Sequence, residues 1–170
     1  MRPRPVEKRV YHNLQMFRFA PLLLAALSAA FAQGSYDGPR PPKPDVPYLK
    51  HASNLVATEP AEAKEEKQKN DTIYTLEGVA SKVETPLASP IFIFQSDKIA
   101  PEKFGLYKFD IKGGHREIVF GPKKQPKAIR LEVTRLDKGL YRLEAGDSLD
   151  PGEYSLSPEG SNHFFCFRVN

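Results

Sequence analysis

Short alternations of apolar and polar residues fill the chain from Thr72 onward, and turn residues separate them. Ile129, Leu131 and Val133 alternate with polar residues, which is typical of a strand with one buried face. Residues 91–94 are apolar at every position, which predicts a strand covered on both faces. The pattern therefore predicts short strands and no long helix.

The pattern predicts seven to nine strands. They are drawn from residues 48–50, 55–57, 73–76, 91–94, 106–112, 116–120, 129–134, 140–144, 153–157 and 164–169. The first two are expected to be edge strands. Residues 59–71 are almost all charged or Ala, and we expect a mobile, solvated loop or a frayed helical turn there. Residues 164–169 are apolar on both faces, so this strand is expected to be central, with a register that the pattern leaves open.

Two tight turns fix further pairings. Gly113-Gly114 predicts a two-residue hairpin that places Tyr107 opposite Phe120, Phe109 opposite Ile118 and Ile111 opposite Arg116. The same hairpin sets Asp110 against Glu117, a repulsion unless Lys108 or Lys112 reaches across. In the next predicted hairpin, around Asp137-Lys138-Gly139, Leu136 is expected to pair with Leu140, Val133 with Leu143 and Arg135 with Tyr141.

A sharp corner is predicted at residues 149–154. Pro151 fixes φ and Gly152 accepts unusual backbone angles, so together they turn the chain. Tyr154 follows, and its hydroxyl is expected to bond to the backbone near residues 146–148. This arrangement resembles the tyrosine corner of Greek-key sandwiches, including fibronectin-type and carboxypeptidase-regulatory-like modules. From about Tyr48 onward the chain also looks like a group of uncharacterised secreted bacterial proteins. The resemblance implies a fold and no activity.

We therefore expect an all-β fold, an antiparallel Greek-key β-sandwich of the immunoglobulin-like kind, over residues 48–170. The alternative is a small β-barrel.

The N-terminal residues predict export. Five basic and one acidic residue fall within residues 1–32, whose apolar run ends in Ala30 and Ala32, the small positions of a signal-peptide cleavage site. The run is shorter than the roughly 20 residues of a membrane-spanning helix. We expect cleavage after Ala32, whether the chain starts at Met1 or Met16, and a secreted or periplasmic protein. Residues 33–47 carry five prolines, which predicts a disordered spacer.

Charge and cysteine content limit the classes of function and chemistry that the sequence supports. Residues 1–32 hold five of the 25 basic and one of the 21 acidic residues, so residues 33–170 hold 20 of each. This balance gives no support for nucleic-acid binding. With a single cysteine, Cys166, no intrachain disulfide forms. Cys166 lies between Phe165 and Phe167, which predicts a small buried apolar residue rather than a reactive thiol.

The sequence gives weak support to a catalytic or metal-binding site. Gly146-Asp147-Ser148-Leu149 matches the nucleophile motif of GDSL-type esterases, but Gly160 stands where the acid before His163 should be. A hydroxyl without a base is a poor nucleophile, so a turn is favoured. His51, His115 and His163 show no metal-binding spacing, although the sequence does not tell whether they converge.

Two surface motifs have simple interpretations. Lys123, Lys124, Lys127 and Arg130 form a basic loop without the exposed aromatics of nucleic-acid modules, which favours a solvated loop. Asn70-Asp71-Thr72 is a glycosylation acceptor pattern, relevant only in a eukaryotic secretory route.

The sequence thus favours a non-catalytic binding or envelope-associated module. We predict no catalytic, cofactor-binding or metal residues, and no membrane segment once the signal peptide is removed. Its partner is an unknown protein or cell-envelope ligand, held by the loops at residues 123–127 and 158–162. The alternative is a small secreted hydrolase whose site is invisible in sequence spacing.

Overall fold

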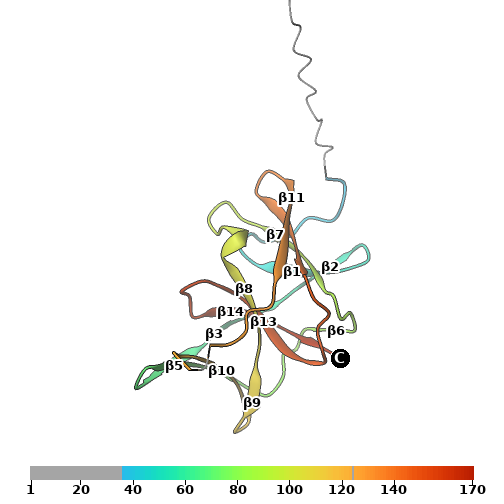
Figure 1. Ribbon diagram of the computed structural model, residues 1–170. Helices are drawn as coiled ribbons and strands as arrows, with labels where there is room; N and C mark the ends of the chain where they lie inside the picture. Colours follow the sequence, from blue (N-terminus) through green and yellow to red (C-terminus); the bar gives the residue numbers. More distant parts are fainter. Residues whose placement is uncertain (1–35, 124) are drawn as a thin grey trace, which may run out of the picture. The chain divides into compact units, whose positions relative to one another are not determined.

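The computed structural model describes residues 36–123 and 125–170. The described residues all belong to one compact unit, Gly34–Asn170 (Figure 1). The expected signal peptide and the first spacer residues, 33–35, lie outside the described residues. Pro47, near the end of the expected spacer, already belongs to the first strand.

The described residues form an all-β fold, as predicted, and the antiparallel sheets do not close, which excludes the small-barrel alternative. The only helical element among them is the short 3-10 turn η1 (Pro101–Lys103). The strands belong to three sheets, which we call sheets A, B and C.

Sheet A contains, in spatial order, β11 (Leu131–Asp137), β12 (Leu140–Ala145), β7 (Ile91–Gln95), β1 (Pro47–His51) and β2 (Asn54–Ala57). Sheet B contains β3 (Glu59–Glu62), β14 (His163–Val169), β13 (Gly152–Pro158) and β8 (Phe104–Lys108), with β6 (Glu84–Thr85) parallel to β14. Sheet C contains β4 (Lys64–Gln68), β5 (Asp71–Glu77), β10 (His115–Phe120) and β9 (Asp110–Lys112).

Sheets A and B pack face to face around the main apolar core. Strand β7 lies between β12 and β1 and is buried along most of its length, as its uninterrupted apolar run predicts. β1 is therefore an interior strand, and only β2 is an edge strand as expected. The buried members of this core are Leu49, Phe92, Phe94, Phe104, Leu106, Leu143, Ala145, Leu149, Tyr154, Leu156, Phe165, Phe167 and Val169.

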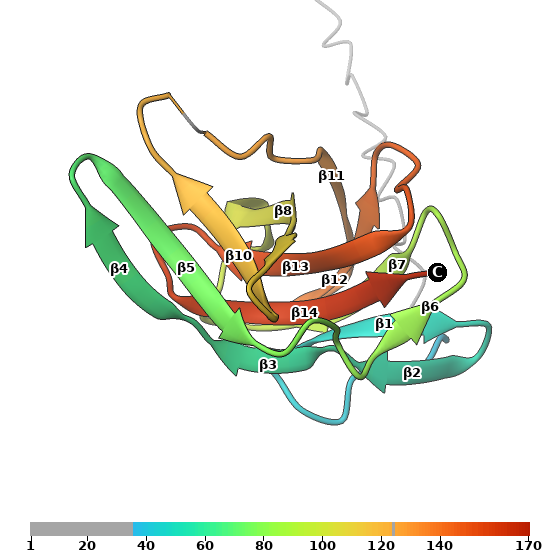
Figure 2. The same cartoon turned by 90° about the horizontal axis from the view of Figure 1, so that it is seen from below.

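The opposite face of sheet B packs against sheet C around a smaller core of Ala63, Leu76, Phe109, Ile118, Phe164 and Cys166. Figure 2 shows β5 and β10 beside sheet B. Strand β14 supplies both cores, with Phe165 and Phe167 on one face and Phe164 and Cys166 on the other. Its central position is thus confirmed, and its register sets Cys166 opposite Ser155.

The expectation of a loop or helical turn at residues 59–71 is wrong. This segment forms β3 and β4, which follow β2 so that residues 54–68 pass through all three sheets (Figure 2). The corners are the buried Thr58, which donates two hydrogen bonds to the Pro47 carbonyl, and the buried Ala63. β4 is the fully exposed edge of sheet C, and charged side chains there protect the edge from pairing with other chains.

The hairpin at Gly113-Gly114 is confirmed, and it pairs Ile111 with Arg116 as predicted. Lys112 bridges the like charges, with its Nζ 2.7 Å from Glu117 and 3.9 Å from Asp110. Asp110 also lies opposite Glu117 as predicted, but the predicted pairs Phe109–Ile118 and Tyr107–Phe120 are absent from this ladder, because residues 104–108 leave the hairpin and pair with β13 in sheet B. The chain bends at the buried Phe109, whose amide donates to the Glu153 carbonyl.

In sheet A, the predicted pairs Val133–Leu143 and Arg135–Tyr141 are present. A bulge after Arg135 pairs Leu140 with Asp137 instead of Leu136. In sheet B, Tyr154 is buried at the predicted corner, but its hydroxyl donates to the Asp150 carbonyl at 2.7 Å rather than to residues 146–148. Tyr154 therefore closes the Pro151-Gly152 turn itself.

Candidate functional site

A pocket of about 350 Å³ opens at one end of the gap between sheets B and C. We call it the aromatic pocket. Its walls come from β5, β8, β10, β13, β14 and the loop after β13. The lining residues are Thr72, Tyr74, Tyr107, Phe120, Ser157, Pro158, Glu159, Gly160, Ser161 and Phe164.

Four aromatic rings form the apolar walls and face in different directions. The Phe120 ring is nearly perpendicular to Tyr74, at 86° and 5.7 Å between centroids, and to Tyr107, at 78° and 5.4 Å. Phe164 is tilted by 58° against Tyr74. Edge-to-face pairs of this kind are a favoured aromatic geometry. The rings therefore enclose a space rather than form a flat platform.

Gly105 determines where the Tyr107 ring lies. Both residues are on β8 and their side chains share one face of sheet B. A β-carbon added at Gly105 would lie 2.3 Å from the Tyr107 ring, so the ring occupies space that only glycine leaves free. One wall of the aromatic pocket thus depends on a missing side chain next to it.

Carboxylates set the electrostatics of the pocket. Among the described residues that line it, Glu159 is the only acid and there is no Lys, Arg or His. Burial, and then the charge of Glu159, raise the pKa of Tyr107 above its ordinary value. Burial, and then the charge of Glu65, do the same to the pKa of Tyr74. Both hydroxyls therefore stay protonated and neutral at physiological pH.

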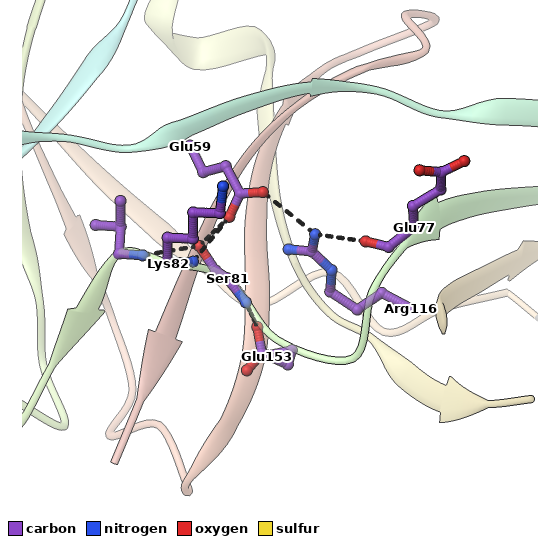
Figure 3. Close-up of polar contacts among 7 residues, drawn as sticks. Glu59, Glu77, Ser81, Lys82, Arg116 and Glu153 are labelled. Carbon is purple, nitrogen blue, oxygen red and sulfur yellow. Dashed lines mark hydrogen bonds and ion pairs between the residues drawn. The ribbon is translucent and has the colours of Figure 1, made fainter. Parts of the chain in front are cut away.

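Further along the same gap lies a buried ion cluster centred on Arg116 of β10 (Figure 3). Its Nη2 lies 3.4 Å from a carboxylate oxygen of Glu59 and donates to the Glu77 carbonyl at 3.1 Å. Glu59 also accepts hydrogen bonds from the Ser81 hydroxyl and the Lys82 amide, and Glu153 accepts one from the Ser81 amide. The cluster ties sheet C to sheet B and to the loop before β6.

The two carboxylates of this cluster titrate in opposite directions. Burial alone would raise the pKa of Glu59, but its hydrogen bonds and the charge of Arg116 together lower it. For Glu153 burial prevails and raises the pKa, although Ser81, Arg116 and Arg168 oppose it. Within the described part of the chain, Nε and Nη1 of Arg116 and the hydroxyl of Ser155 are buried without a hydrogen-bond partner.

The prediction that Cys166 is buried and unpaired is confirmed. Its thiol lies on the face of β14 toward sheet C, and burial raises its pKa to about 12. A protonated, inaccessible thiol is a poor nucleophile.

Ser148 and His163 are not brought together. Ser148 is exposed in the loop before β13, at the end of sheet B where Gly152 pairs with Val169. His163 begins β14 at the other end, roughly 20 Å away at the rise of an extended strand. His51 in sheet A contacts Thr85 at 3.1 Å, and His115 begins β10 in sheet C. In residues 36–123 and 125–170 no group of His, Cys, Asp or Glu is placed to hold a metal ion.

The described basic residues of the predicted basic loop, residues 123–130, have different surroundings. Arg130 pairs with Glu132 at 3.0 Å, and Lys124 lies outside the described residues. Lys127 lines an open groove of about 430 Å³ that mixes Lys108 and Lys112 with Asp110 and Glu117. The groove carries both signs of charge. Asn70, of the glycosylation pattern, is exposed in the turn between β4 and β5.

The sequence predicts a binding loop at residues 158–162, which lines part of the aromatic pocket, but it does not predict the aromatic walls. It also placed Tyr107 beside Phe120, which is true of their rings, although they lie on different sheets. The available signal was an aromatic residue in each of β5, β8 and β10, namely Tyr74, Tyr107 and Phe120.

Comparison with known protein families, with curated proteins and with solved structures found no match to this chain. Over the described residues, no helix has the length and apolar character needed to cross a membrane.

Proposed function

We propose that this protein is a non-catalytic binding module that holds a small ligand in the aromatic pocket. The observation that carries the proposal is a pocket of about 350 Å³ with four aromatic walls and a polar loop at its edge. Ligand sites in proteins have this volume and this mixture of apolar walls with few polar groups.

The separation of the candidate catalytic groups supports a binding role over the hydrolase alternative. Ser148 and His163 lie at opposite ends of sheet B, and Cys166 is buried with a raised pKa. We expect no hydrolysis of ester, peptide or glycoside substrates above background. Turnover that Ser148→Ala abolishes, with circular dichroism unchanged, would favour the hydrolase instead.

Export is part of the same proposal, since the N-terminal residues have the signal-peptide pattern. The ligand would then be met outside the cytoplasm, in the periplasm, at the cell envelope or in the medium. N-terminal sequencing of the exported protein should begin at Gln33. Full-length chain found in the cytoplasm would contradict this.

The binding proposal is tested by titrating the isotope-labelled chain with glucose, N-acetylglucosamine, indole and choline, and following amide chemical shifts by NMR. At least one compound should shift the amides of Tyr74, Tyr107 and Gly160 together. If none of the four shifts them, the proposed function fails.

Gly105→Ala provides the variant for this test, because the new methyl group displaces the Tyr107 ring without removing an aromatic. Gly38→Ala is a matched control, because the Gly38 β-carbon would meet the Tyr36 ring at the same 2.3 Å, outside the residues that line the pocket. Gly105→Ala should weaken binding by about tenfold, the loss of one good contact, and Gly38→Ala should leave it unchanged. Equal effects of the two variants would contradict the assignment to this pocket.

A further inference from the structure

The following inference rests on the proposed function. We propose that the aromatic pocket selects a small organic cation, a quaternary or alkylated ammonium compound free in solution. Three observations favour this ligand: the orientation of the aromatic rings, the negative charge at the pocket wall and the hydrogen bonds of the serine hydroxyls.

The orientation of the rings suits a compact, convex group. Phe120 stands at 86° to Tyr74 and at 78° to Tyr107, so ring faces and edges meet around the pocket. A flat sugar or aryl ring stacks best on one exposed aromatic face, whereas a tetrahedral ammonium group contacts several walls at once. Ring faces carry the negative end of the aromatic quadrupole and attract cations, most strongly where water is excluded.

The charge of the pocket favours the same ligand. Glu159 lines it, Glu65 acts on Tyr74 from the neighbouring strand β4, and no basic residue is among the described lining residues. A cation entering the pocket meets the Glu159 carboxylate and aromatic faces, while Lys67, which pairs with Glu65 at 3.7 Å and lies opposite Thr72 on the neighbouring strand, offsets the charge of Glu65. An anion would meet the Glu159 carboxylate and no basic residue among the described lining residues.

The two serine hydroxyls in the wall are engaged to different degrees. Ser157 donates its proton to the His163 carbonyl at 2.9 Å, and the Ser161 oxygen accepts the His163 amide at 3.0 Å. A sugar needs several hydroxyl partners, and of these two serines only Ser161 has a hydroxyl proton to offer it. The volume of about 350 Å³ is near the lower limit for ligand sites, which favours a small molecule.

The experiment compares choline with its neutral isostere, in which carbon replaces the quaternary nitrogen, by NMR titration of the full chain. The two compounds have the same shape and differ in charge. We expect choline to bind at least about fivefold more tightly, as a cation–π contribution of moderate strength predicts. Equal affinity overturns the cation proposal and leaves the binding function intact.

Two carboxylate variants test whether the preference for choline arises in the aromatic pocket. Glu159→Gln should weaken choline binding several-fold and leave binding of the isostere unchanged. Glu84→Gln makes the same charge change on β6, which pairs with β14 at Arg168 and Val169, the end of the strand remote from Phe164, and should change neither. If both variants weaken choline equally, the cation is bound by general surface charge and the proposal is wrong.

The remaining outcomes separate the two proposals. If glucose, N-acetylglucosamine or indole shifts the pocket amides and choline does not, the cation proposal fails and the binding function stands. If choline and the three other probes all leave the pocket amides unmoved, both fail together.

Discussion

Sheet B is a single sheet with two contrasting faces. Its face toward sheet A is covered by a core of thirteen buried residues, whereas the face toward sheet C has a core of six. The second face also holds Arg116, a free thiol, buried hydroxyls and the aromatic pocket. Burial of unpaired polar groups costs free energy, and cavities remove packing contacts. One face therefore supplies most of the stability and leaves the other able to carry polar groups and open space.

The largest expected effect uses Cys166, which reports on the interface between sheets B and C. A thiol reagent should label it at least about a thousandfold more slowly in the native protein than in urea, because the thiol is buried. The free energy of opening obtained from this rate should still be smaller than that of global unfolding, since sheet C has the weaker core. Rapid native labelling would contradict burial, and equal free energies would show that the two interfaces open together.

Two phenylalanines of β14 compare the interfaces directly. Phe167 packs against Phe92 at 5.0 Å between centroids, while Phe164 borders the aromatic pocket. Phe167→Ala should lower the free energy of unfolding by about 3–5 kcal/mol, and Phe164→Ala by about 2–3 kcal/mol, because part of its surroundings is already open. Urea denaturation measures both. An equal or larger loss for Phe164→Ala would show that the two faces are packed alike.

The corner in sheet B is tested by Tyr154→Phe. This change removes the hydrogen bond to the Asp150 carbonyl and keeps the ring stacked on Phe167. The variant should lose about 1 kcal/mol, the usual contribution of one hydrogen bond, seen as a lower urea midpoint. Tyr141→Phe on β12 is the control. An unchanged midpoint for Tyr154→Phe would mean that the corner does not need its hydroxyl.

The smallest expected changes in stability come from substituting Glu59 and Glu153, the two carboxylates near Arg116. These two changes should have opposite signs. Glu59 has a lowered pKa, so its charged form stabilises the fold above about pH 4.3 and this stability is lost in acid. Glu153 has a raised pKa, so the fold favours its neutral form and loses stability as the pH rises through the folded pKa.

At pH 7, Glu59→Gln should therefore destabilise and Glu153→Gln should stabilise the protein, each by a fraction of a kcal/mol. Both differences should disappear well below pH 4, where the wild-type carboxyls are neutral as well. Thermal unfolding across this pH range measures them. The same sign for both variants would contradict the opposite pKa shifts.

The sequence predicts a strand when its burial leaves a clear apolar pattern, and it predicts a pairing when the partner is close by in the chain. β7 and β14 were found because strands covered on both faces are apolar at nearly every position. β4 was missed, since an exposed edge strand carries the charged residues that otherwise indicate a loop. The pairing of β8 was wrong because its partner, β13, lies far along the chain while the Gly113-Gly114 turn offered a nearby one.

The candidate site was harder to predict for the same reason. Its walls come from residues as far apart as Tyr74 and Phe164, which meet only because β5 and β14 belong to packed sheets. Local patterns describe each wall as ordinary core. Only the polar, Gly-containing loop at residues 158–162 has a sequence signature of its own.

The position of β14 has a consequence for how fast the unit folds. Its neighbour β3 precedes it by about a hundred residues, and a side-chain bond from Asn162 to Glu62 spans a separation of 100. Contacts over such distances close large loops before any stability is gained, which slows folding. Refolding should therefore take about milliseconds to seconds, as in other sandwiches rich in non-local pairs. Until β14 is in place, sheet B lacks the strand that supplies side chains to both cores.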